Sequence, residues 1–184
     1  ASLEAQLAEG ALDLVIDNYE FNEDIYTSEL LYTENLILAV NKKFVDNDFL
    51  DSYKLSTEDI INKKHLDASV QVVPLNSFKD KPFLFLRSGN DTCFRAERIC
   101  HGQGFTPNIS LRLDQQITAY NLACYGMGIT FISDTLVQHV KPDNNMFYFK
   151  LDSNESERKV CFYRKSGKYV TKAVEEFLRI SKEL

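Results

Sequence analysis

Short apolar runs alternate with amphipathic segments through the second half of the chain, and this order constrains the fold more than any other feature. Apolar runs with strand spacing occupy residues 83–86, 109–113 and 129–132, and helical periodicity follows each of them. Parallel strands need a long crossover connection, which is usually a helix that covers one face of the sheet. The sequence therefore predicts an α/β fold with parallel strands in this region.

The flanking segments extend this pattern towards both ends of the chain. Residues 1–9 have helical spacing and stop at Gly10, and residues 171–184 form an amphipathic helix with its apolar side chains on one face. Further strands are predicted at 12–16, 25–32, 35–41, 147–151 and 159–164. The polar segment 42–81 is either a series of turns with a short helix opening at 56–59 or a long surface insertion.

The overall composition narrows the class of protein. A chain of 184 residues is long enough for one ordinary domain or two small lobes, and 44% hydrophobic with 26% charged residues is typical of a globular protein. Its 21 basic and 27 acidic residues give a net charge of −6, which is unfavourable for gripping nucleic acid with this part of the protein. Apolar stretches reach only about five residues, as in 36–40, whereas a membrane-spanning helix needs roughly 18.

The first ten residues and the cysteines predict a cellular compartment. No secretion signal is visible, and an amphipathic helix without a beginning predicts a fragment of a longer protein. Cys93, Cys100, Cys124 and Cys161 lack CxxC or zinc spacing, which favours reduced thiols in the cytoplasm. Two helical turns separate Cys93 from Cys100 by about 10 Å, and bridged Cα atoms lie roughly 4.4–6.8 Å apart, so we expect small core residues there.

Signatures of known enzyme classes are missing from the sequence. It contains no GxSxG, P-loop, HExxH or GxGxxG motif. His65, His101 and His139 are far apart along the chain, and each is expected at the surface or at the end of a helix. We therefore predict a protein that is not an enzyme, with no cofactor and no metal site.

Polar side chains cluster where predicted strands pass into helices. They are Ser88, Asn90, Asp91, Thr92, Asp114, Gln115, Gln116 and Ser133. The carboxyl ends of parallel strands meet at one edge of a sheet, and the helices that start there present N–H groups suited to anions. The alternative is that Thr92, Asp114 and Ser133 are only helix N-caps, each contributing about 1 kcal/mol. A shared pocket for a small polar or anionic ligand and simple capping both remain open.

Several motifs, taken in order, resemble the effector-binding domain of LysR-type transcriptional regulators. The matching segments are Gly10 with Leu12–Ile16 (G-x-L-D-L-V-I), Pro82–Leu86 with the Ser88-Gly89 turn, Cys100 to Pro107 (C-x-x-x-G-F-x-P), Gly126–Ile132 (G-x-G-I), and Arg158–Tyr163 with the terminal helix. Together they cover most of the chain in the order and spacing of that family.

The resemblance implies a periplasmic-binding-protein-like type II fold, with two lobes that are each a mixed sheet flanked by helices. Lobe one is expected at 1–82 plus 158–184 and lobe two at 83–157, with 82–86 as one of the crossover strands. A small metabolite would bind in the cleft between the lobes and alter the shape of a homodimer or homotetramer. DNA would be contacted only by a winged helix–turn–helix that precedes this domain, and there would be no membrane partner.

Effector-binding residues follow from the resemblance position by position. They are Ser88, Asn90, Asp91, Thr92, Gln115, Gln116, Thr118 and Ser133 in lobe two, with Ser2, Asp17 and Asn18 in lobe one. The family's first strand is missing before Ala1, 42–76 is longer than its usual link, and Ser133 replaces a common proline.

Two other functions compete with the regulator. A solute-binding protein of a transporter shares this fold, and a redox sensor would use Cys93 and Cys100. In the family's peroxide-sensing branch the second cysteine stands at the position of Cys100, but Asp91 occupies the position of the first. The sequence therefore favours a metabolite sensor over a peroxide switch.

Overall fold

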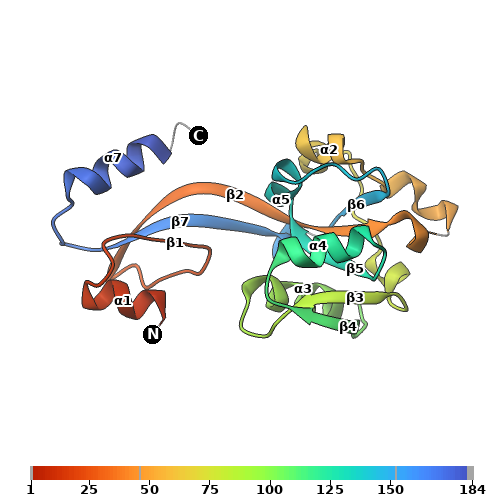
Figure 1. Cartoon of the computed structure of the whole chain (residues 1–184), viewed down its shortest axis with the longest axis horizontal. Helices are drawn as coiled ribbons and strands as arrows, with labels where there is room; N and C mark the ends of the chain where they lie inside the picture. Colours follow the sequence, from red (N-terminus) through yellow and green to blue (C-terminus); the bar gives the residue numbers. More distant parts are fainter. Residues whose placement is uncertain (1, 46, 152, 182–184) are drawn as a thin grey trace. The chain divides into compact units, whose positions relative to one another are not determined.

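The computed structural model describes residues 2–45, 47–151 and 153–181, which form two compact units. Unit 1 consists of Ala1–Glu34 with Arg158–Leu184, and unit 2 of Asn35–Glu157. Strand β2 (Tyr26–Asn41) contributes to both, and Figure 1 shows it as one unbroken strand. The sequence predicts two strands there, which is wrong because no turn interrupts the chain at Glu34, whose side chain is buried and paired.

Unit 1 is built on a small antiparallel arrangement of strands. Strand β1 (Val15–Asp17) pairs with β7 (Glu157–Lys165), and β7 also neighbours β2. Helix α1 (Leu3–Glu9) precedes β1, and α7 (Lys172–Ser181) follows β7. The predicted stop of α1 is confirmed, because Gly10 adopts a left-handed conformation with φ of +80° and closes the helix.

The core of unit 1 is small and largely aromatic. Its buried side chains are Leu7, Val15, Phe21, Tyr26, Cys161 and Tyr163. The rings of Phe21 and Tyr163 stack with centroids 4.4 Å apart. Glu34 and Arg158 form a buried ion pair in the same unit. Helix α7 contacts β7 through Phe177 and Phe162, but Phe177 keeps 48% of its surface exposed.

Unit 2 is organised around a mixed sheet. Strand β3 (Pro82–Leu86) lies between β4 (Asn108–Leu113) and β5 (Ile129–Ser133) and is parallel to both. The second half of β2 is antiparallel to β5 and to β6 (Met146–Lys150). The parallel strands predicted at 83–86, 109–113 and 129–132 are therefore confirmed, as is the α/β class of the fold.

Several helices follow the strands of unit 2 from β3 onward. They are α3 (Asp91–Gly102), α4 (Gln116–Cys124), α5 (Asp134–His139) and the short α6 (Ser153–Ser156). The aromatic rings of Phe83, Phe85 and Phe131 pack together in the core, with centroids 5.7 to 6.0 Å apart. The hydroxyl groups of Tyr120 and Tyr148 meet at 2.8 Å and satisfy each other inside this apolar region.

Segment 42–81 consists of short turns that pack onto unit 2. They are η1 (Lys42–Phe44), η2 (Asp48–Tyr53), α2 (Thr57–Ile61), η3 (Lys64–Leu66) and η4 (Leu75–Phe78). The helix expected at 56–59 is confirmed, with Ser56 and Asp59 forming a capping box. Leu50, Ile60 and Phe78 are almost fully buried in the unit 2 core, which overturns the alternative of a surface insertion.

The boundary predicted between the lobes, after residue 82, stays a prediction. The compact units themselves divide after Glu34, because 42–81 contributes its apolar side chains to the core of unit 2. Pro82–Leu86 lies inside unit 2 between two partner strands. Strand β2 passes from unit 1 to unit 2, and the chain returns to unit 1 at the first residues of β7.

The two glycines of the G-M-G-I motif have separate structural roles. Gly126 follows α4 with φ of +71°, a conformation that other residues adopt only with strain. Gly128 lies where a Cβ atom would come within 2.7 Å of the Pro82 carbonyl oxygen and 2.8 Å of Leu84 Cγ. The second glycine therefore permits the close approach of β5 to β3.

Candidate functional site

Three predicted site residues meet in unit 2 through the side chain of Gln116. Its Nε2 donates to Thr92 Oγ1 at 2.8 Å, and its Oε1 accepts from the backbone N–H and the hydroxyl of Ser133 at 3.1 and 3.2 Å. Thr92 and Ser133 are 3% and 6% exposed. One amide thus joins the first turns of α3 and α4 to the end of β5. This cluster, Thr92–Gln116–Ser133, is called the Gln116 bridge.

The capping interpretation is wrong for all three residues to which it was applied, since the N-cap position of α4 belongs to Gln115 and not to Asp114. Asn90, not Thr92, caps α3, because its Oδ1 accepts the backbone N–H of Thr92 at 2.9 Å. Ser133 occupies the N-cap position of α5, but its hydroxyl makes no cap bond and points instead to Gln116. Asp114 pairs with Arg87 at 2.8 Å on the open surface.

The remaining predicted residues of unit 2 surround the Gln116 bridge without joining it. Asp91 begins α3 and forms an ion pair with Arg95, one turn later, at 2.8 Å. Ser88 lies in the exposed turn after β3. Gln115 and Thr118 are exposed, Gln115 at the N-cap position of α4 and Thr118 within its first turn. Their side chains are directed to solvent, where a small molecule has access to them.

The three residues predicted from the first lobe lie in unit 1 and are held by local structure. Ser2 caps α1 by accepting the N–H of Ala5 at 3.2 Å. Asp17 ends β1 and accepts the N–H of Tyr19 at 3.0 Å, and Asn18 follows it in a bend. A capping serine and a carboxylate that closes a turn are both explained without a ligand.

Sequence reasoning did not predict a buried histidine–aspartate hydrogen bond beside the Gln116 bridge. His65 is 2% exposed, and its Nε2 lies 2.8 Å from Oδ2 of Asp134, the residue after Ser133. The expectation of a surface histidine is therefore wrong for His65, although His101 and His139 lie in the last turns of α3 and α5 as expected. A histidine in a polar segment, 69 residues before its partner, offers no signal in the sequence.

Electrostatics around Asp134 keep its side chain ionised. Burial raises the pKa of this carboxyl, but hydrogen bonds from His65 and from the backbone N–H of Asn35 outweigh burial, so the pKa falls below its ordinary value. An ionised Asp134 accepts, so His65 Nε2 is the donor. Among the residues that the structure describes, His65 Nδ1 is buried without a hydrogen-bond partner.

The cysteine side chains are poorly suited to redox chemistry. Burial raises the pKa of Cys100 to about 12 and that of Cys124 to about 11. Burial also raises the pKa of Cys93, despite Arg112 at 3.4 Å from its sulfur. The thiolate is the reactive form, so these protonated thiols are weak nucleophiles at neutral pH. The predicted role of Cys93 and Cys100 as small buried residues fits their 2% and 0% exposure.

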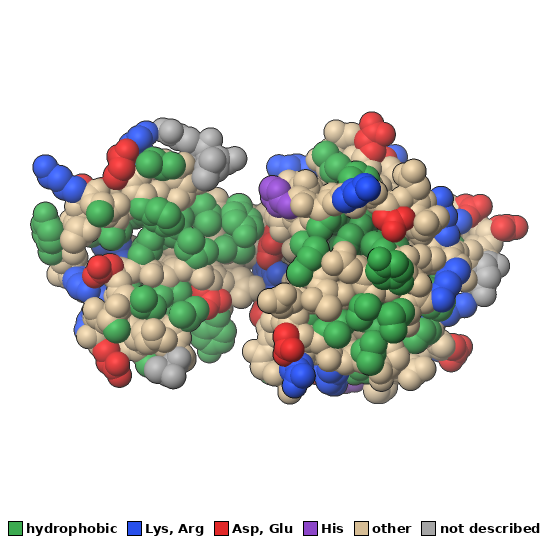
Figure 2. Space-filling view, viewed as in Figure 1, with side chains coloured by type: hydrophobic (Ala, Val, Ile, Leu, Met, Phe, Trp, Pro, Cys, Tyr) green, Lys and Arg blue, Asp and Glu red, His purple; other side chains and the backbone are tan. Residues whose placement is uncertain are grey.

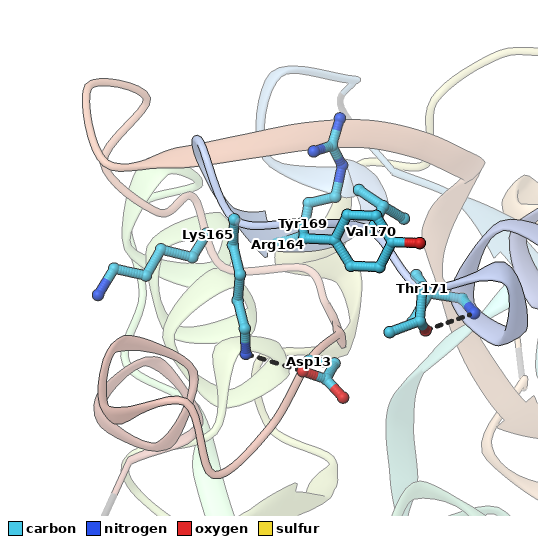
Figure 3. A pocket seen from close by; sticks show the side chains of 8 residues that line it. Asp13, Arg164, Lys165, Tyr169, Val170 and Thr171 are labelled. Carbon is cyan, nitrogen blue, oxygen red and sulfur yellow. Dashed lines mark hydrogen bonds and ion pairs between the residues drawn. The ribbon is translucent and has the colours of Figure 1, made fainter.

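Unit 1 also has a small concavity lined by basic side chains. Figure 3 shows side chains that line it, among them Asp13, Arg164 and Lys165. Lys168 also lines it and donates to Asp13 at 2.8 Å, so these two charges are paired with each other. Within 2–45, 47–151 and 153–181, no group of three or more His, Cys, Asp or Glu side chains is arranged to hold a metal ion. The helices described there are also too short and too polar to cross a membrane.

Large apolar side chains are exposed on both units. Tyr125 and Met127 after α4 are 84% and 50% exposed, and Tyr169 before α7 is 80% exposed. Figure 2 shows hydrophobic side chains gathered on the visible face of each unit. Extensive exposed apolar surface is typical of proteins that contact other chains.

Comparison with curated proteins identifies bacterial transcriptional regulators. The HTH-type transcriptional regulator YcgK of Bacillus subtilis is 24% identical over 185 residues, a match that covers 99% of this chain and 54% of that protein. The HTH-type transcriptional regulator CzcR of the same organism is 24% identical over 156 residues, covering 80% of this chain and 53% of that one. The chain thus spans about half the length of the curated relatives it matches.

Solved structures confirm the predicted periplasmic-binding-protein-like type II fold. The CcmR regulatory domain of Synechocystis PCC6803 in complex with 2-PG superposes with a TM-score of 0.70 at 17% identity, covering 98% of this chain and 77% of that one. The effector-binding domain of QuiR in complex with shikimate gives a TM-score of 0.67 at 14% identity, covering 98% and 75%. The family model of the LysR substrate binding domain matches residues 1–184. The chain belongs to the LysR substrate-binding domain family.

Proposed function

We propose that this chain is the sensing part of a LysR-type transcriptional regulator and that it binds a small polar or anionic metabolite. The observation that carries the proposal is the family match over residues 1–184. It is supported by the curated relatives, which are HTH-type regulators, and by neighbours of the same fold solved with 2-PG and with shikimate. The family is regulatory, and we propose that this chain catalyses no reaction.

The Gln116 bridge is the proposed centre of the effector site. Its donors and acceptors lie at the carboxyl end of β5 and at the first turns of α3 and α4, where ligands of α/β proteins are bound. A ligand carboxylate or hydroxyl would exchange hydrogen bonds with this amide. The proposed contacts are Ser88, Asn90, Asp91, Thr92, Gln115, Gln116, Thr118 and Ser133 from unit 2, with Ser2, Asp17 and Asn18 from unit 1.

Regulation would follow from a ligand that favours one arrangement of the protein over another. A coupling of about 1–3 kcal/mol is typical of such effects. In the proposed mechanism two lobes, 1–82 plus 158–184 and 83–157, change their arrangement when the metabolite binds. The change would reach DNA through a helix–turn–helix outside this chain, in a cytoplasmic assembly of several copies. Exposed apolar residues such as Tyr125 support self-association.

The two competing functions receive less support. A transport protein for solutes shares the fold, but the family match and both curated relatives favour regulation. A redox sensor needs reactive thiols, whereas burial raises the pKa of Cys93 and Cys100. The regulator therefore remains the function that the observations favour.

Thermal unfolding in the presence of small carboxylic acids tests the proposal. The chain is melted alone and with a panel that includes shikimate, and each compound that raises the melting temperature is titrated by calorimetry. We expect the Gln116→Ala variant to bind such a compound at least tenfold more weakly than the wild type, because Thr92 and Ser133 lose their shared partner. Asn121→Ala, which removes an exposed amide further along the same helix and outside the proposed contacts, is the matched control and should bind as the wild type does.

The possible outcomes separate the site from the function. Equal affinity of the wild type and Gln116→Ala would show that the Gln116 bridge is not the effector site. A regulator that binds its promoter identically with and without every stabilising compound would overturn the proposal that the domain senses them.

A further inference from the structure

The chain passes between the two units at two peptide bonds. One lies between Glu34 and Asn35, inside β2, and the other between Glu157 and Arg158, at the start of β7. Both crossings lie within β-strands, so neither is a loose linker. Any displacement of one unit against the other has to pass through these residues, and their contacts inside unit 2 therefore matter.

The crossing in β2 is tied to the N-terminus of α5. Asp134 Oδ1 accepts the backbone N–H of Asn35 at 2.9 Å, and Oδ2 lies 3.4 Å from the side-chain amide of Asn35. His65 donates to the same carboxylate from segment 42–81. Asp134 is 5% exposed and directly follows Ser133 of the Gln116 bridge. Charge-assisted hydrogen bonds of this kind are strong, so this carboxylate holds Asn35 firmly to the residue that follows Ser133.

The crossing in β7 is tied in the same way to the first turns of α3. Arg95 Nη1 donates to the carbonyl oxygens of Glu155 and Glu157 at 3.2 and 3.0 Å. The Nε atom of the same guanidinium donates to Asp91 at 2.8 Å. Asp91 directly precedes Thr92, so the Arg95 side chain joins the chain neighbour of a bridge residue to the last residue of unit 2.

Both sets of hydrogen bonds end at residues next to the Gln116 bridge. Gln116 joins Thr92, beside Asp91, to Ser133, beside Asp134. We propose that Asp134 and Arg95 are positioning residues that couple the effector site to the two points at which the chain leaves unit 2. This inference rests on the proposed function only in calling the bridge an effector site. The coupling itself exists in the ligand-free protein, and the experiment below measures it in that state.

Nuclear magnetic resonance of the labelled chain tests the coupling without an effector. Gln116→Ala perturbs the bridge, and the amide chemical shifts of Asn35 and Arg158 report on the crossings. We expect Gln116→Ala, made in the otherwise wild-type chain, to change the chemical shifts of both amides. In the Arg95→Met background, Gln116→Ala should no longer change the amide shift of Arg158 but should still change that of Asn35. In the Asp134→Asn background, it should no longer change the amide shift of Asn35 but should still change that of Arg158. Each variant thus serves as the folding control of the other.

A matched control removes a neighbouring arginine from the same helix. Arg98 pairs with the carboxylate of Glu155 but is 70% exposed and has no contact with the crossing carbonyl at Glu157, so Arg98→Met should leave both responses intact. Gln116→Glu provides a second perturbation if the alanine variant does not fold. Responses that survive in both the Arg95→Met and Asp134→Asn backgrounds, or no response to either Gln116 substitution, would overturn the coupling. Failure to find a metabolite that binds would instead count against the proposed function alone.

Discussion

Unit 2 and unit 1 hold their candidate site residues by different means. In unit 2, Thr92, Gln116 and Ser133 are joined by hydrogen bonds between elements far apart in the sequence, above a core that extends from Leu36 to Leu151. In unit 1, Ser2 and Asp17 accept hydrogen bonds from backbone N–H groups three and two residues further along the chain. Tertiary hydrogen bonds preorganise a site, whereas local ones only close turns. The difference teaches that unit 2 supplies the rigid half of the proposed site.

The largest expected contrast comes from removing one phenyl ring in each unit. Phe83 is fully buried against Phe85 and Phe131, so Phe83→Ala should cost about 3–5 kcal/mol of unfolding free energy. Phe177 is half exposed, and Phe177→Ala should cost about 1 kcal/mol because less apolar area returns to water. Urea unfolding measures both. Equal losses would show that unit 1 packs as tightly as unit 2.

The buried carboxylate of Asp134 in unit 2 gives the next largest effect. Asp134→Asn should cost about 1–3 kcal/mol at pH 7, since His65 and Asn35 lose a charged acceptor. The folded pKa of Asp134 lies below the ordinary value of 3.8, so the stabilisation is complete above 3.8 and is lost as pH falls through the folded pKa. Urea unfolding at several pH values should therefore show wild type and variant converging in acid.

An exposed carboxylate provides the control for this pH dependence. Asp114 pairs with Arg87, but both side chains are more than two-thirds exposed, and such pairs contribute little. Asp114→Asn should therefore lie close to the wild type at every pH. A constant difference between Asp134→Asn and the wild type down to strong acid would contradict the assignment of the stabilisation to the ionised carboxylate.

Sequence patterns predicted the elements of unit 2 better than its contacts. The strand at 83–86 and the helix after it follow from local periodicity, which each segment carries within itself. The burial of 42–81 did not follow, because its few apolar residues, such as Leu50 and Ile60, are spaced among polar ones. Whether a polar segment lies on a core or in solvent depends on the surface it meets, and that surface comes from distant residues.

The candidate site shows the same limit. Polar residues after strands could be placed at one edge of a sheet by topology alone, which brought Thr92, Gln116 and Ser133 into one prediction. Which of them would cap a helix and which would form the bridge depends on side-chain direction, so Asn90 and not Thr92 proved to be the cap. His65 was missed because its partner is fixed only by the tertiary fold.

The smallest expected effect comes from removing one helix cap in each unit. Asn90 accepts from Thr92 at the start of α3, and Ser2 accepts from Ala5 at the start of α1, so each alanine substitution removes one cap bond worth about 1 kcal/mol. If only these bonds mattered, urea unfolding would show similar losses of unfolding free energy for the two variants. The surroundings differ, because the capped N–H in unit 2 belongs to a residue of the Gln116 bridge. Amide exchange at Gln116 and Ser133 should therefore rise in Asn90→Ala and stay unchanged in Ser2→Ala. Local fraying confined to residues 91–93 would show instead that the bridge holds its geometry without its cap.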